Sequence, residues 1–108
     1  MAAPAAISEV VGELRSRLQR TYGPRLAGLW LFGSQARGNA APGSDIDVLV
    51  VLEGAVDATA EIAHTEYDVA EVSLTYNTVV TCLFVSSEQF AREQSPLLLN
   101  VRREGVAV

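Results

Sequence analysis

Apolar residues near the start of the chain recur three and four positions apart, which is the spacing of one helix face. They are Ile7, Val10, Val11, Leu14 and Leu18. This pattern predicts a helix from Ala6 to about Arg20 that packs one face on a core. Tyr22-Gly23-Pro24 should end it, because proline cannot continue a helix and glycine favours a C-terminal cap.

Runs of continuous or β-branched apolar residues after Pro24 predict three strands, with helical patterns between and after them. The strands are expected over Leu26–Phe32, Asp45–Leu52 and Thr78–Ser86. The helices are expected for a short stretch from Ser34, between Asp57 and Tyr76, from the capped start Ser86–Phe90, and from Ser95-Pro96 to near Gly105. Together these elements predict a single domain over residues 1–108, of the α+β (α/β) class, with helices covering a small β-sheet.

Composition narrows the class of protein. The chain has 108 residues, of which 49% are hydrophobic and 19% charged, as is typical of one globular core. No apolar run approaches the ~20 residues that a membrane-spanning helix needs. The start, Met1-Ala2-Ala3-Pro4, lacks the basic region of a signal peptide. We therefore expect no membrane association and a cytoplasmic location.

Charge argues against nucleic acid as a partner. Eight basic and thirteen acidic side chains leave a net charge of −5, which repels a phosphate backbone. Arginines gather at Arg15, Arg17 and Arg20 and again at Arg102-Arg103, but solvated helix positions account for both groups. The apolar stripe of the first helix and a bare edge strand both stay open as surfaces for self-association.

Two chemically reactive residues are expected to be structural. Cys82 is the only cysteine and lies in an apolar run, so it cannot form an internal disulfide and should be a buried thiol. His64 falls in the helix predicted between Asp57 and Tyr76 and should face solvent. The candidate chemistry lies elsewhere.

Two short motifs meet where the first two predicted strands adjoin. Gly33-Ser34 ends one apolar run, and Asp45 and Asp47 begin the next. If both acids lie on a strand, their side chains project to one face, because positions two apart share a face. Such paired carboxylates suit Mg²⁺, which keeps several waters and takes other ligands from phosphates. Gly33 and a helix starting at Ser34 would bring backbone N–H groups to a phosphate.

Each half of this pattern has a plain structural alternative. An Asp-x-Asp at a strand start is often a solvated edge or a turn cap, and Gly-Ser is common in turns. Both halves together, one after an apolar strand and one before another, favour a nucleotide site in which an anion pocket faces a cation site.

The segments Gly33-Ser34, Ala36-Arg37-Gly38 and Ser44-Asp45-Ile46-Asp47 resemble the motif of the nucleotidyltransferase superfamily that includes DNA polymerase β, and within it the minimal nucleotidyltransferases. The resemblance covers about twenty residues, Leu31 to Leu52. It implies a polymerase β-like core with a small mixed sheet. It also implies that Gly33, Ser34, Arg37 and Gly38 bind the nucleotide, that Asp45 and Asp47 are catalytic and hold two Mg²⁺ ions, and that ATP is the donor substrate.

The chain departs from the family in one respect. Better-equipped relatives carry a third carboxylate on a neighbouring strand, which helps to deprotonate the attacking hydroxyl. The segment from Asn77 to Ser87, where that strand is expected, holds no Asp or Glu. Glu71 and Glu88 flank the segment, but no spacing argument brings either one into the site.

The resemblance also implies a partner. Small stand-alone chains of this kind resemble the minimal nucleotidyltransferases that act as antitoxins of HEPN-type toxins, and catalytic members transfer AMP from ATP to a hydroxyl, commonly a tyrosine, of that partner. Two functions stay open. The intact Gly-Ser and Asp-x-Asp favour a Mg²⁺-dependent protein adenylyltransferase, and the missing third acid favours a catalytically weak or inactive nucleotide-binding antitoxin that neutralises its partner by binding.

Overall fold

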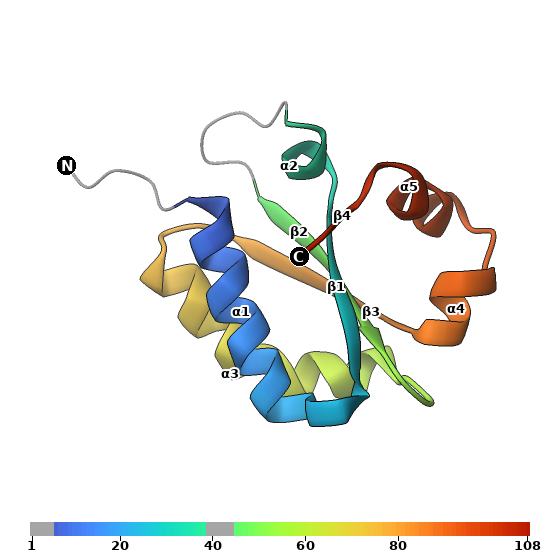
Figure 1. Ribbon diagram of the computed structural model, residues 1–108. Helices are drawn as coiled ribbons and strands as arrows, with labels where there is room; N and C mark the ends of the chain where they lie inside the picture. Colours follow the sequence, from blue (N-terminus) through green and yellow to red (C-terminus); the bar gives the residue numbers. More distant parts are fainter. Residues whose placement is uncertain (1–5, 39–44) are drawn as a thin grey trace.

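The computed structural model describes residues 6–38 and 45–108, so the turn predicted over Asn39–Ser44 lies outside the described residues. The elements are α1 (Ile7–Tyr22), the 3-10 turn η1 (Gly23–Arg25), β1 (Leu26–Phe32), α2 (Ser34–Arg37), β2 (Ile46–Leu52), α3 (Ala58–Thr75), β3 (Val80–Ser86), α4 (Ser87–Arg92), α5 (Pro96–Glu104) and β4 (Val106–Ala107). Figure 1 shows three layers, with α1 and α3 on one side of the sheet and α4 and α5 on the other. The predicted helices and strands are therefore confirmed, with shifted ends.

The sheet has the order β3-β2-β1-β4 and is mixed. β1 runs antiparallel to β2 and to β4, whereas β3 runs parallel to β2. β2 is central and almost entirely buried, as its continuous apolar sequence predicts. The expected α+β class with a small mixed sheet is confirmed.

Two strand predictions need correction. β3 begins at Val80 rather than at Thr78, because the end of α3 folds back on itself there: Asn77 has a φ of 50° and the Thr78 N–H donates to the Ser73 carbonyl over 3.0 Å. β4 was not predicted at all. It has only two residues, which carry no period of their own, and it exists through pairing with β1.

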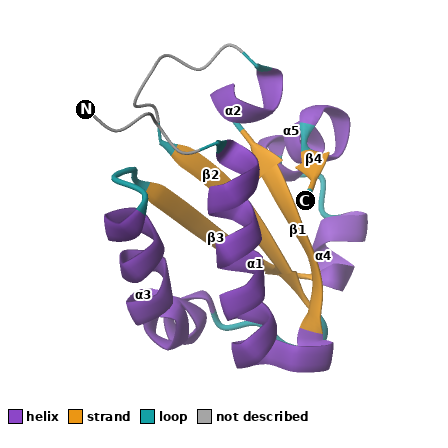
Figure 2. Cartoon of the chain, turned by 60° about the vertical axis from the view of Figure 1, so that its left-hand side comes forward, coloured by secondary structure: helices purple, strands orange, loops and turns teal. Residues whose placement is uncertain are grey.

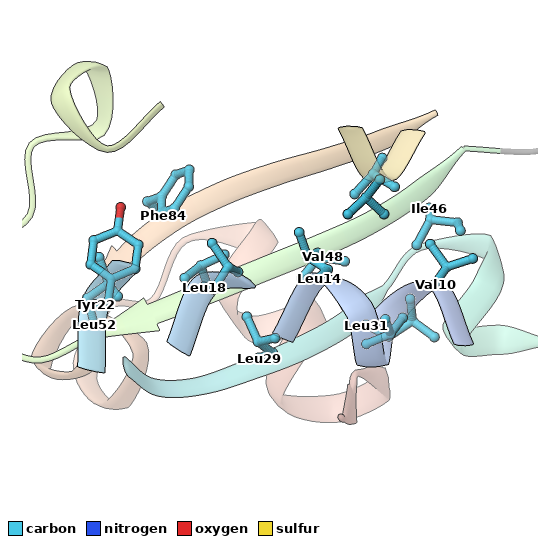
Figure 3. Close-up of a cluster of buried hydrophobic side chains, with 14 residues drawn as sticks. Val10, Leu14, Leu18, Tyr22, Leu29, Leu31, Ile46, Val48, Leu52 and Phe84 are labelled. Atoms are coloured by element: carbon cyan, nitrogen blue, oxygen red, sulfur yellow. The ribbon is translucent and has the colours of Figure 1, made fainter. Parts of the chain in front are cut away.

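The apolar stripe of α1 is buried, which excludes it as a surface for self-association. Figure 3 shows Val10, Leu14 and Leu18 of α1 packed against side chains of β1 and β2, including Leu29 and Val48. A second cluster, on the other face of the sheet, is made by Leu49, Val51, Leu98 and Val101. Both faces of the central strands are thus covered by helices.

Helix ends follow the capping signals in the sequence. The side chain of Asp57 accepts hydrogen bonds from the Thr59 and Ala60 N–H groups at the start of α3. Ser86 and Gln89 form a reciprocal capping box at the start of α4. Among the described helices, none combines the length and the apolar character that crossing a membrane requires.

One buried polar contact ties α1 to α3. The Tyr22 hydroxyl, at the end of α1, donates to a carboxylate oxygen of Glu61 over 3.0 Å, and Glu61 is only 5% exposed. The Arg25 guanidinium lies 4.0 Å from the other carboxylate oxygen. Burial and the Glu61 carboxylate raise the pKa of the Tyr22 hydroxyl, so it stays a donor at neutral pH.

Removing this donor should destabilise the fold. We expect Tyr22→Phe to lower the free energy of unfolding by about 1–3 kcal/mol, because the buried Glu61 carboxylate loses a hydrogen bond. Urea unfolding followed by circular dichroism measures the change. Tyr67→Phe is the matched control, since Tyr67 is 72% exposed and donates to Glu71 at the surface. Equal stability of the two variants would contradict the role of Tyr22.

Candidate functional site

The Gly33-Ser34 pair lies at the junction of β1 and α2. Gly33 has a φ of 72°, in the region that favours glycine, and there the chain leaves the strand and turns into a single helical turn. Gly38 closes that turn with a φ of 74°, and its N–H donates to the Gln35 carbonyl over 3.3 Å. Ser34 is therefore the first residue of a tight turn that directly follows the sheet.

Asp47 is the second residue of β2. Its backbone pairs with Phe32 of β1 on one side and with Thr81 of β3 on the other. Positions two apart in a strand share a face, so Asp47 lies on the same face as Leu49 and Val51, the face that α5 covers further along. Its side chain is half-buried at the uncovered end of that face.

Asp45 is not part of the strand, contrary to the prediction that both acids lie on it. β2 starts at Ile46, whose N–H donates to the Val79 carbonyl over 2.8 Å, and Asp45 precedes this first ladder bond and is exposed. The strand-period argument therefore holds for Asp47 alone. The two carboxylates are nevertheless close enough for the charge of Asp45 to act on Asp47.

The two motifs meet at one point. A Cβ atom added to Gly33 would lie 2.6 Å from Oδ2 of Asp47, so a side chain there would displace the carboxylate. The φ of 72° favours glycine at this position, and glycine lets the Asp47 carboxylate lie directly beside the backbone. The sequence analysis found both motifs, but it did not find that they touch, because contact depends on the register of β1 against β2.

Electrostatics favour a cation at this point. Partial burial and, after it, the negative charge of Asp45 raise the pKa of the Asp47 carboxyl above its ordinary value. A divalent cation bound by both carboxylates would relieve this repulsion, and hard oxygen ligands are the type that Mg²⁺ takes. The residues present therefore fit a magnesium site that completes its coordination with water or phosphate oxygens.

A third acidic ligand does not join them in the part of the chain that the structure describes. No group of three or more His, Cys, Asp or Glu side chains is placed there to hold a metal ion. Glu71 accepts a hydrogen bond from Tyr67, and Glu88 pairs with Arg92 over 3.5 Å. The position on β3 directly beside Asp47 is Thr81, an exposed hydroxyl.

The structure also bears on the other residues singled out in the sequence, except where their side chains lie outside the described part of the chain. Arg37 ends α2 and Gly38 follows it; the Arg37 side chain lies outside what the structure describes. His64 is exposed on α3, as expected. Cys82 is partly buried rather than fully buried as predicted; it packs against the core beside β2, and burial raises the pKa of its thiol to about 12.

The raised pKa of Asp47 predicts a stability effect of Asp47→Asn. The folded state binds the Asp47 proton more tightly than the unfolded state does, so the free energy of unfolding falls as pH rises through the raised pKa. Asparagine removes this loss. We expect the metal-free variant to be more stable than the wild type at pH 7, with the difference disappearing below pH 3.8, the ordinary pKa of the carboxyl. Thermal unfolding of both proteins, measured at steps of ~1 pH unit from pH 3 to pH 8, gives this difference in stability. A difference between variant and wild type that does not change with pH would contradict the prediction.

Comparison with known proteins identifies structures that share this fold and the family to which the chain belongs. A solved toxin-antitoxin with AMP-PNP is similar at 20% identity and a TM-score of 0.64, covering 94% of this chain and 72% of that one. Two mutants of the toxin-antitoxin MntA-HpeT are similar at 18% and 23% identity, with TM-scores of 0.58 and 0.56, covering 86% and 87% of this chain and 67% and 68% of theirs. No curated protein matches. These structures share the fold, and residues 7–97 match the model of the nucleotidyltransferase domain, so this chain belongs to the nucleotidyltransferase domain family.

Proposed function

We propose that this domain binds ATP with Mg²⁺ and transfers AMP to a hydroxyl group of a HEPN-type partner protein, for which it is the antitoxin. Tyrosine is the acceptor residue that we expect. The contact between Gly33 and Asp47 is the observation that carries the proposal, because it sets a phosphate-binding turn directly against a metal-binding carboxylate. Similar folds in toxin-antitoxin structures, one of them with AMP-PNP, support the choice of partner and nucleotide.

Each motif residue has a role in this proposal. The backbone at Gly33 and Ser34 binds the triphosphate, since glycine at the tight turn after β1 lets backbone N–H groups approach a phosphate closely. Arg37 and Gly38 belong to the same turn and complete the phosphate site. Asp45 and Asp47 would hold Mg²⁺, which when bound neutralises phosphate charge and polarises the phosphorus to be attacked.

The transfer itself is a substitution at the α-phosphorus. The acceptor oxygen forms a bond to that phosphorus, the bond to the bridging oxygen of the β-phosphate breaks, and pyrophosphate leaves. The acceptor hydroxyl must also lose a proton. Thr81 occupies the strand position beside Asp47, and a threonine hydroxyl is no base at neutral pH. The proton therefore goes to water or to a group of the partner.

Thr81 also favours a second candidate function. A positioned base contributes ~10²–10⁴-fold to such a reaction, and without it the domain can bind nucleotide and partner while transfer is slow or absent. In that case the protein neutralises its partner by binding. The two candidates share the nucleotide site and differ only in whether AMP reaches the partner.

Labelled nucleotide distinguishes the candidates. With α-labelled ATP, Mg²⁺ and the product of the neighbouring gene, which we expect to be a HEPN-type protein, we expect label on the partner. Asp45→Asn with Asp47→Asn should reduce it by at least about a hundredfold, because the charge-stabilising ligands are lost. Asp68→Asn is the matched control, as Asp68 pairs with Arg17 on the far side of the sheet. A tight complex without label in the wild type would establish the binding antitoxin instead, and unchanged labelling by the double variant would overturn the site.

Thr81→Asp tests whether the missing base limits the rate. An aspartate there lies beside Asp47 on the same face of the sheet, where the family places its third acid. We expect faster labelling, up to the roughly 10²–10⁴-fold that a positioned base contributes. Leu83→Asp adds the same charge one pair further along β3 and should leave the rate unchanged. If Thr81→Asp folds and labels no faster, proton removal does not limit transfer.

A further inference from the structure

The outward face of α3 has no part in the candidate site. Its apolar side chains recur at spacings of three and four, and all are exposed; we call them the α3 seam, and they are Ala60, Ala63, Tyr67, Ala70 and Leu74. The two large members are strongly exposed, Tyr67 at 72% and Leu74 at 80%. Large apolar side chains gathered on one surface typically mark an interaction site.

The fold itself does not need this face. The opposite side of α3 packs against α1 and the sheet through Glu61, Thr65 and Val72, which are buried. Figure 2 shows α3 at the outside of the molecule, with α1 and β3 on its inner side and no other element beyond it. The helix therefore has a buried inner face and an exposed apolar face, and only the inner one is accounted for by folding.

The spacing of the seam identifies the kind of surface that fits it. Alternating steps of three and four are the a and d positions of a heptad repeat, whose partner is another helix. The three alanines allow a second backbone to approach closely, and Tyr67 and Leu74 supply the knobs. The eighteen residues of α3 extend over about 27 Å, long enough for two heptads to engage.

Charge decides between a second copy and a different chain. Glu66 and Glu71 flank the seam at the positions that face a partner's flanks in a coiled coil, and the chain carries a net charge of −5. Two copies paired through α3 would bring like charges together, which is unfavourable. A helix with lysine or arginine beside its apolar positions would instead be attracted.

We infer that the α3 seam binds an amphipathic helix of the toxin partner, with basic side chains of that helix beside Glu66 and Glu71. This inference rests on the proposed function for the partner's identity. The seam lies on the α1 side of the sheet, whereas Asp47 lies on the α5 side (Figure 1). Docking on the seam therefore holds the partner without covering the carboxylates, and partner binding and nucleotide binding are separable.

The test measures the Kd of the full chain for the product of the neighbouring gene, the proposed HEPN-type partner. Tyr67→Ala with Leu74→Ala should weaken binding by roughly thirtyfold, as expected for two large interface anchors. Both side chains are mostly exposed, so the fold should be kept. Ile62→Ala is the matched control: it is 54% exposed on the same helix but outside the heptad positions, and its Kd should stay within about twofold.

A charge variant and a nucleotide readout complete the test. Glu66→Lys with Glu71→Lys should also raise the Kd. The increase relative to the wild type should be larger at low salt than at high salt, because salt screens the electrostatic attraction that is lost. ATP affinity should be unchanged in every seam variant. If the complex forms and the Tyr67/Leu74 variant binds with the wild-type Kd, the seam inference fails while the proposed function stands. If no complex forms, both the inference and the proposed partner are overturned. If α3 mediates a homodimer in sedimentation experiments, the seam inference alone is overturned.

Discussion

The site depends on the close approach of Gly33 to the Asp47 carboxylate. Antiparallel register fixes it: Phe32 pairs with Asp47, so the residue after Phe32 must pass directly beside that side chain. Glycine readily adopts the φ found there and leaves Oδ2 of Asp47 undisplaced. One pair of strands thereby sets the spacing between the turn and the carboxylate for which we propose phosphate and metal binding, and the rest of the fold holds this pair of strands in place.

Holding it requires a central strand that cannot slip. A shift of β2 by one residue would turn Asp47 towards the core under α1 and exchange the side chains that pack on the two faces of the strand. Leu49 and Val51 pack under α5, and Val48 and Val50 pack under α1, so either direction of slip is costly. The unfavourable placement of Asp47, half-buried beside another carboxylate, is tolerated because the burial on both sides of the strand far outweighs it.

Much of this could be predicted from the sequence. The periodicity of α1 and the continuous apolar run of β2 are strong signals, and the Gly-Ser and Asp-x-Asp motifs predicted the candidate site that the structure brings together at the end of β1 and the start of β2. Two kinds of feature escaped. β4 forms only through its pairing with β1, and β3 starts where the end of α3 allows it. The few residues involved do not encode either feature by themselves. The contact between Gly33 and Asp47, and the position of Thr81 beside it, depend on strand register. The α3 seam escaped for another reason: α3 buries the polar residues Glu61 and Thr65 and exposes apolar ones, so its sequence shows only a weak amphipathic period.

Cys82 gives the protein a built-in reporter. It is the only thiol in the chain, it stays protonated and packed against the core, and it is the next residue after Thr81 on β3. A thiolate, not a thiol, reacts with alkylating reagents, so labelling requires β3 to open locally. The rate of Cys82 labelling then measures how often β3 opens beside the site. Slower labelling after nucleotide or partner is added would show, without any introduced probe, how far each one stabilises the sheet.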